Sequence, residues 1–373
     1  MNDIKKLQKV ANNPYEYAEQ QKKQTSPKII GYFCSYTPEE LIYAAGALPF
    51  RIFGAEVSTV HAAAHLQAYC CSLARGGLEE ALAGSLNFLD GTVFPHTCDT
   101  MQRLSDIWRL NAGFPLHFDV VLPSKLNSES ANQYIVDILH RFKRDLEECL
   151  DVEITDERLK QTIRLYNEIR RALEEIYLLR SENPDIISGS QLYVILKSAM
   201  VMDRKDFQHQ LSQVLSELKT EDELIQTSQK KRIILAGGVC NHPDIYSILE
   251  ECGGVVVWDD LCTGTRYFNG EIDENVDPIE AIARRYFERM ICPTKHFDIT
   301  YRGENLVRIA KEKKAHGVIF LFLKFCDPHA FDYPYLKKYL DKKGIPNMLL
   351  EVEQQIPAVG QLRTRLEAFV EML

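Results

Sequence analysis

The sequence predicts an α/β protein with two parallel-sheet lobes and a mainly helical region between them. Short runs of β-branched and aromatic residues recur in two blocks, and segments with helical length and periodicity separate these runs. The runs are apolar throughout instead of alternating, which is typical of parallel strands covered by helices on both faces. No repeat of fixed short period occurs, only two similar halves.

Four segments follow from this pattern. We expect an N-terminal helical segment at 1–25, a first lobe at 26–128, a helical region with a linker at 129–228, and a second lobe with a C-terminal helix at 229–373. The strands predicted for the first lobe are "KIIGYFC", "LPFRIF", "GTVFPHTC" and "FDVVLP". Those predicted for the second lobe are "KRIILAGG", "GVVVWDD", "GVIFLFLKF" and "PNMLLEV".

Helical periodicity identifies the segments between the strands. Residues 156–181, "DERLKQTIRLYNEIRRALEEIYLLRS", keep a period of 3.6 for several turns. Shorter helices are expected at 278–289 and 305–314, and an amphipathic helix at 360–373. The polar stretch 217–231, "ELKTEDELIQTSQKK", is the predicted linker.

Composition and charge exclude several classes of protein. The 373 residues carry 44 basic and 53 acidic side chains, and no long basic run occurs, which argues against a nucleic-acid partner. The N-terminus lacks the apolar core of a signal peptide, and no stretch is apolar and long enough to span a membrane. We therefore expect a cytoplasmic protein. In that reducing compartment its ten cysteines would not form structural disulfides.

Half of the cysteines fall at positions where ligands collect in α/β proteins. Cys34, Cys98 and Cys326 follow predicted strands directly, and Cys240 and Cys262 lie just beyond two others. Parallel sheets bind ligands outside the carboxyl ends of their strands. The remaining thiols fall elsewhere: Cys292 precedes a proline, Cys70 and Cys71 lie near a helix start, and Cys149 and Cys252 end helical patterns as ordinary core residues would.

The spacing of the cysteines indicates a site assembled from distant thiols. The absence of C-x-x-C argues against zinc ribbons, zinc fingers, a thioredoxin-type pair and the compact ferredoxin run. Thiolates with few histidines nearby favour an iron–sulfur cluster, and buried or regulatory thiols are the alternative. No P-loop is present, so ATP-dependent chemistry would need a second protein.

Five stretches are spread from about residue 25 to the C-terminus: "GYFCSYTPEELIYAAGALPFRIFG", "DGTVFPHTCDTMQRLSDIW", "DDLCTGTRYF", "FCDPHAFDYPYLKK" and "EVEQQIPAVGQLRTRLEAFVEML". In sequence and in order they resemble the signature stretches of one known family, that of the 2-hydroxyacyl-CoA dehydratases and benzoyl-CoA reductases. The resemblance implies two Rossmann- or flavodoxin-like lobes with an oxygen-sensitive iron–sulfur cluster in the cleft between them. By motif, Cys34, Cys98 and Cys326 match the three cysteines that hold a 4Fe-4S cubane in the dehydratases.

Three further thiols match the double-cubane cluster proteins of the same family. In that branch two cubanes joined by a sulfide, an 8Fe-9S cluster, take six cysteines from one chain. The second set would be Cys71, Cys262 and Cys292. The choices of Cys71 over Cys70 and of Cys262 over Cys240 stay open, as does a single 4Fe-4S cluster.

Several polar residues lie next to these cysteines in the sequence. His96 and His329 flank expected ligands and could give hydrogen bonds or protons to a bound substrate. Arg266 could compensate the charge of a cluster or hold an anionic group. Asp99 and Asp327 follow cysteines directly, and we expect them to cap the next helices.

The resemblance leaves three functions open. The first is an anaerobic reductase, a homodimer that receives electrons from an ATP-hydrolysing iron–sulfur activator and passes them to a small molecule. The second is a subunit of a 2-hydroxyacyl-CoA dehydratase, paired with a paralogous subunit in a heterodimer. The third is a non-catalytic cluster or electron carrier.

Overall fold

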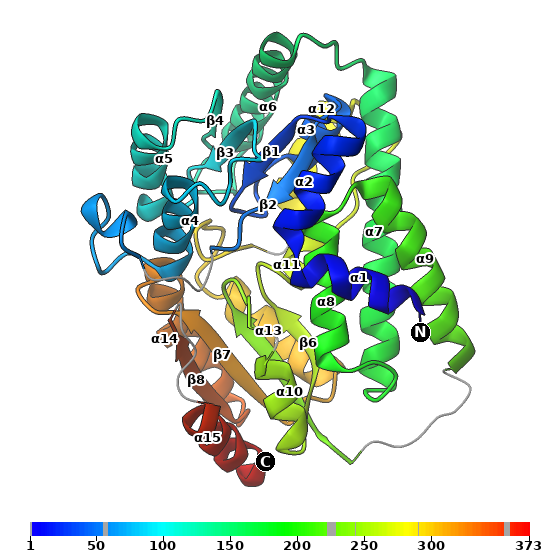
Figure 1. Cartoon of the computed structure of the whole chain (residues 1–373). Helices are drawn as coiled ribbons and strands as arrows, with labels where there is room; N and C mark the ends of the chain where they lie inside the picture. The colour runs from blue at the N-terminus through cyan, green and yellow to red at the C-terminus, as the bar shows by residue number, and fades with distance from the viewer. Residues whose placement is uncertain (1, 55–58, 222–228, 243, 290, 354–358) are drawn as a thin grey trace.

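Two parallel four-stranded sheets form the framework of the protein (Figure 1). The computed structural model describes residues 2–54, 59–221, 229–242, 244–289, 291–353 and 359–373. The first sheet contains β1 (Ile29–Tyr32), β2 (Leu48–Arg51), β3 (Gly91–Pro95) and β4 (Leu116–Val120), in the order β2-β1-β3-β4. The second contains β5 (Lys231–Gly237), β6 (Gly254–Asp260), β7 (Gly317–Leu323) and β8 (Asn347–Val352), in the equivalent order β6-β5-β7-β8.

The predicted fold class is confirmed. Every neighbouring pair of strands is parallel, and each predicted strand is present close to its expected position. All residues of β1, β3 and β7 are buried, as uninterrupted apolar runs predict. In both sheets the strand order reverses between the first and third strands of the lobe, β1 and β3 or β5 and β7. Ligands collect at such a reversal.

Helices surround the sheets and form the region between them. The N-terminal helices are α1 (Asn2–Asn12) and α2 (Pro14–Thr25), and the first lobe adds α3 (Glu39–Ala44), η1 (Ala62–Ala64), α4 (Ser72–Leu82) and α5 (Asp99–Asn111). The middle region contains α6 (Glu129–Leu150), α7 (Asp156–Glu182), α8 (Gly189–Val201) and α9 (Arg204–Glu221). The second lobe contains α10 (Asp244–Glu251), α11 (Thr265–Phe268), α12 (Pro278–Glu288), α13 (Tyr301–Glu312), α14 (Asp327–Lys342) and α15 (Val359–Met372).

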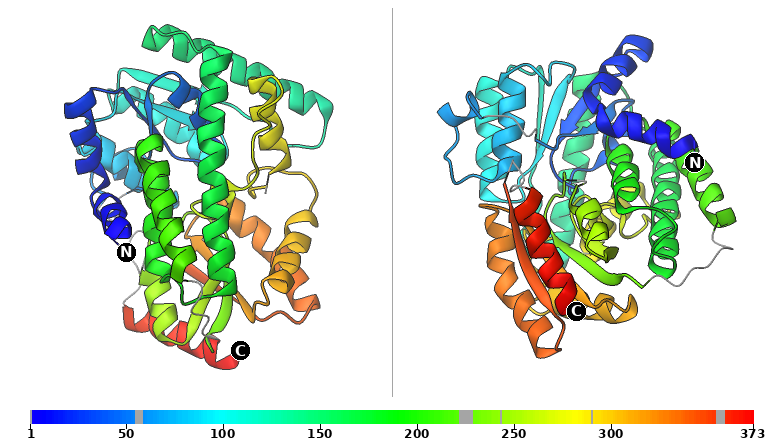
Figure 2. Two further views of the ribbon diagram at one scale, coloured as in Figure 1. Left: turned by 90° about the vertical axis from the view of Figure 1, so that its right-hand side faces the viewer. Right: turned by 60° about the horizontal axis from the view of Figure 1, so that its bottom comes forward.

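The long helix α7 connects the two lobes. It packs against α3 of the first lobe and against β6 and α11 of the second, and Figure 2 shows it running beside both. The predicted linker begins inside α9, and its residues 222–228 lie outside the described part of the chain. Among the described helices, none has both the length and the apolarity that a membrane crossing requires.

One glycine allows the ends of β5 and β7 to come close together. A Cβ atom on Gly237 would lie 1.9 Å from the backbone oxygen of Leu321 in the neighbouring strand. Any side chain at this position would therefore clash with the backbone of β7. Gly237 is the last residue of β5, and its carbonyl oxygen accepts a hydrogen bond from Arg266. The ends of β5 and β7 therefore come closest at the point where the strand order of the second sheet reverses.

A buried ion pair ties the helical region to the first sheet. Arg204, at the start of α9, is fully buried and donates to Glu39 of α3 at 2.7 Å. It also donates to the carbonyl oxygen of Pro49 in β2 at 3.0 Å and to the hydroxyl of Tyr166 in α7 at 3.1 Å. One guanidinium thus satisfies groups on three elements that are distant in sequence.

We predict that Arg204→Met lowers the free energy of unfolding by about 3–5 kcal/mol, because the change leaves the buried Glu39 carboxylate without its counter-charge. Urea unfolding followed by circular dichroism measures this loss. Lys337→Met is the matched control, since it breaks an exposed pair with Asp341 and should change stability by about 0.5 kcal/mol or less. Equal effects of the two changes would contradict the prediction.

Candidate functional site

Six of the ten thiols gather where the carboxyl ends of the two sheets face each other. They are Cys34, Cys71, Cys98, Cys262, Cys292 and Cys326. Burial raises the pKa of Cys98 to about 12, and Cys71, Cys34 and Cys292 contribute to that rise. Burial likewise raises the pKa of Cys326, with contributions from Cys71, Cys98 and Cys292. Thiols from both lobes are therefore close enough to repel one another when ionised.

Three of the six thiols occupy the N-cap positions of helices. Cys71 precedes α4, Cys98 precedes α5 and Cys326 precedes α14. A backbone amide of the first turn favours the ionised form in each case and lowers the pKa of the thiol, against the larger effect of burial. A helix N-terminus carries partial positive charge, so the three helices all favour negative sulfur at these positions.

The prediction that Asp99 and Asp327 cap these helices is wrong. Each aspartate is the first residue of its helix, and the preceding cysteine is the N-cap. Cys98 has the extended backbone typical of a cap, because the chain turns from strand to helix at the cysteine itself. The aspartates remain exposed in the first turn, where a carboxylate suits the helix dipole.

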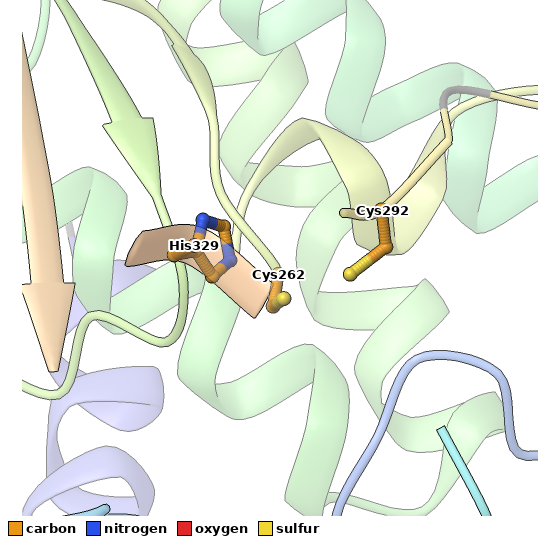
Figure 3. Close-up of side chains that lie close together, drawn as sticks. All are labelled: Cys262, Cys292 and His329. Atoms are coloured by element: carbon orange, nitrogen blue, oxygen red, sulfur yellow. The ribbon is translucent and has the colours of Figure 1, made fainter. Parts of the chain in front are cut away.

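Cys262, Cys292 and His329 form a compact group that could hold a metal ion (Figure 3). Their possible ligand atoms all lie within 4.8 Å of one another, and all three side chains are at least nine-tenths buried. A hydrogen bond from Cys262 lowers the pKa of Cys292 well below its usual value, and Arg266 and Thr294 lower it further against the effect of burial. The pair therefore favours one negative charge beside Arg266.

Arg266, for which a role in compensating cluster charge or holding an anionic group stays a prediction, lies beside Cys262. Its Nη2 atom is 3.2 Å from the sulfur of Cys262, and its side chain is almost fully buried. Asp260, which also accepts a hydrogen bond from Arg302 at 2.9 Å, lies 3.2 Å from the Arg266 guanidinium. Two guanidinium groups thus share one carboxylate beside the thiols.

The two predicted histidines occupy different surroundings. Burial, together with Arg266 and Arg302, lowers the pKa of His329 well below its usual value, so its imidazole is neutral. His96 lies at the end of β3 and contacts Asp119 of β4 at 2.7 Å. No interaction between His96 and a thiol is found in the described part of the chain, so a catalytic role for it stays a prediction.

The other four thiols lie apart from the six or at their edge. Cys240 contacts the carbonyl oxygen of His242 at 3.8 Å, and burial raises its pKa to about 12. Cys70 adjoins Cys71 and is half-buried, Cys149 is exposed, and Cys252 faces the carbonyl oxygen of Arg363. The interactions of the described residues thus connect Cys262 to the group and do not connect Cys240.

Sequence reasoning missed two buried cations beside the thiols. Arg289 and Lys295 are each 3% exposed, and no ion pair joins either to a carboxylate of a described residue. Arg289 lies 4.0 Å from the ring centre of Tyr36 and donates to the carbonyl oxygen of Ser35 at 2.9 Å. Lys295 donates to the carbonyl oxygen of Leu122 at 2.9 Å. Only their nearness to Cys292 in the sequence could have suggested these residues.

The thiols and cations together fit an iron–sulfur cluster. Burial lowers the pKa of Lys295 to about 8, whereas the thiolates of Cys34 and Cys292 act to raise it. Burying a cation without a partner costs several kcal/mol, so a negative group is required nearby. Thiolates that bind metal remain ionised, which would supply this charge and relieve the repulsion among the six sulfurs.

Comparisons with known proteins identify the family. A family model described as 2-hydroxyglutaryl-CoA dehydratase, D-component, matches residues 34–373. The chain is 32% identical to the (R)-phenyllactyl-CoA dehydratase beta subunit of Clostridium sporogenes, with 100% of this chain and 98% of that protein covered. It is 30% identical to the (R)-2-hydroxyglutaryl-CoA dehydratase subunit beta of Acidaminococcus fermentans, with 99% and 98% covered.

A reductase is among the similar proteins as well. The chain is 27% identical to one of the subunits of the benzoyl-CoA reductase of Thauera aromatica, with 95% of this chain and 94% of that protein covered. The matches extend over both lobes and the helical region, as the five sequence motifs predicted. The chain belongs to the family of 2-hydroxyacyl-CoA dehydratases and benzoyl-CoA reductases, whose members are enzyme subunits.

Proposed function

We propose that this protein is an oxygen-sensitive iron–sulfur reductase that binds a double-cubane cluster through Cys34, Cys71, Cys98, Cys262, Cys292 and Cys326. It would receive low-potential electrons from an ATP-hydrolysing activator and transfer them to a small molecule. The observation that carries the proposal is the gathering of six thiols from both lobes beside buried cations that lack carboxylate partners among the described residues. When bound, such a cluster supplies one-electron reduction at low potential.

The surrounding residues have distinct roles in this proposal. Arg266, Arg289 and Lys295 would stabilise negative charge at the sulfurs. His329 is neutral, so it has one N–H donor and one acceptor nitrogen with which to position a substrate beside Cys262 and Cys292. Helix N-termini stabilise Cys71, Cys98 and Cys326.

A pocket that would suit a small substrate adjoins the segments that carry Cys292 and Cys326, although none of the thiols lines it. It has a volume of about 320 Å³ and lies between the segment that follows Cys292 and the first turns of α14. Pro293, Lys295 and Pro328 line it, and exposed Phe297 and Phe331 form part of its walls. Its size is at the lower end of the range for ligand pockets, which favours a small molecule.

A second function is supported by the names of the relatives. Two of those described are beta subunits of dehydratases. In this alternative the chain holds one 4Fe-4S cubane and pairs with a paralogous subunit, whereas the reductase would be a homodimer. The two functions differ in iron content, about four or about eight atoms per chain.

We predict about eight iron atoms and a similar amount of acid-labile sulfide per chain after anaerobic purification. Replacing any one of the six thiols by serine should lower this content, because each is a proposed ligand. The change Cys149→Ser is the control and should leave the content unchanged, since that thiol is exposed and distant from the group. Full iron content in all six variants would exclude the proposed site.

We predict that Lys295→Met makes the cluster harder to reduce, because it removes a buried positive charge near Cys34, Cys292 and Cys98. A tenfold fall in the ratio of reduced to oxidised cluster at fixed potential corresponds to about 59 mV for one electron. Potentiometric titration monitored by electron paramagnetic resonance measures the shift. Lys343→Met removes an exposed charge and should leave the potential unchanged. An unshifted Lys295→Met protein would contradict the proposed role.

We predict that reduction depends on the activator and ATP, since the chain has no P-loop. An anaerobic assay with chemical reductant, activator and ATP, each omitted in turn, tests this dependence. Turnover that is equally fast with reductant alone would show that the ATP-driven partner is dispensable. No turnover under any condition, with the cluster still reduced, would instead favour an electron carrier.

A further inference from the structure

We propose that the six thiols divide into one set formed by Cys71, Cys98 and Cys326 and another formed by Cys34, Cys262 and Cys292, each holding one cubane. This inference rests on the proposed double-cubane function and refines it. It differs from matching by motif, which groups Cys34 with Cys98 and Cys326 and leaves Cys71 with Cys262 and Cys292.

The starts of three helices bring the first set together. Cys71, Cys98 and Cys326 are the N-cap residues of α4, α5 and α14. Helix α4 packs against α5, so the two helices that begin after Cys71 and Cys98 are neighbours. Ser72, the first residue of α4, and Leu323, the last residue of β7, line the same small pocket. The start of α4 therefore lies near the end of β7, from which the chain runs on to the start of α14.

A different set of contacts brings the second set together. The ligand atoms of Cys262 and Cys292 lie within 4.8 Å of each other. The loop that follows Cys34 is joined to the segment that contains Cys292 by two hydrogen bonds. Arg289 donates to the carbonyl oxygen of Ser35 at 2.9 Å, and the amide of Cys292 donates to the hydroxyl of Tyr36 at 3.5 Å. Cys34 is thus held on the side of Cys292.

The two sets also differ in how negative charge is stabilised. The first set lies at three helix N-termini, which supply partial positive charge through backbone amides. The second set lies beside full positive charges. Arg266 is 3.2 Å from the sulfur of Cys262, and both Arg289 and Lys295 lie against the ring of Tyr36 in the Cys34 loop. Two environments of this kind suit two separate groups of three thiolates.

Two double variants that share one substitution test the division. If each cubane depends on its own three thiols, Cys71→Ser with Cys98→Ser removes only one cubane and leaves about four irons per chain. Cys34→Ser with Cys98→Ser disrupts both cubanes and leaves almost none. Grouping by motif predicts the opposite result for both variants. Iron and acid-labile sulfide are measured after anaerobic purification, and no activity is required.

The controls separate this inference from the function on which it rests. Cys149→Ser with Cys252→Ser should retain the wild-type iron content, and circular dichroism should show that all variants are folded. With about eight irons in the wild type, any pattern other than four and none in the two double variants overturns the division. A wild-type content near four overturns the double-cubane proposal itself, and the division with it.

Discussion

Thiols and positively charged side chains are buried together between the two lobes of this protein, and the charge of each group depends on the other. Six thiols lie close enough to raise one another's pKa, while Arg289 and Lys295 are buried without a carboxylate partner among the described residues. Neither a thiolate nor a cation is stable alone in a low-dielectric interior. Each supplies the charge that the other lacks, provided that the thiols are ionised.

The fold delivers these groups to one place through two sheets with the same strand order. In both lobes the order reverses between the first and third strands, and the thiols lie near the carboxyl ends of the strands. Gly237 allows the ends of β5 and β7 to approach closely at one of these reversals. Helix α7 packs on both lobes, and Arg204 ties the helical region to the first sheet. Helices that contribute none of the six thiols therefore keep the carboxyl ends of the two sheets facing each other.

The similarity to dehydratase and reductase subunits extends over the whole chain, which places the fold and the general chemistry in one family. The number of cubanes and the substrate are a separate matter, because they depend on a few side chains. Six thiols, three buried cations beside them and a pocket of about 320 Å³ are the features of this chain that support a reductase of small molecules. In the dehydratase alternative, the same fold would hold one 4Fe-4S cubane in place of the two proposed.

Local periodicity and short motifs in the sequence were enough to predict the fold class, the strands, the family and which thiols follow strands. The sequence also predicted Arg266 beside the cysteines. The difference between Cys262 and Cys240 depends on tertiary contacts, because both follow strands of one sheet. The sulfur of Cys262 lies within 4.8 Å of the possible ligand atoms of Cys292 and His329, whereas that of Cys240 contacts the carbonyl oxygen of His242. The surroundings of Arg289 and Lys295 likewise depend on tertiary contacts, because these buried cations lie beside a loop more than 250 residues away in sequence. Asp99 and Asp327 do not cap the helices as expected, because the cysteine before each of them occupies the N-cap position at the turn from strand to helix.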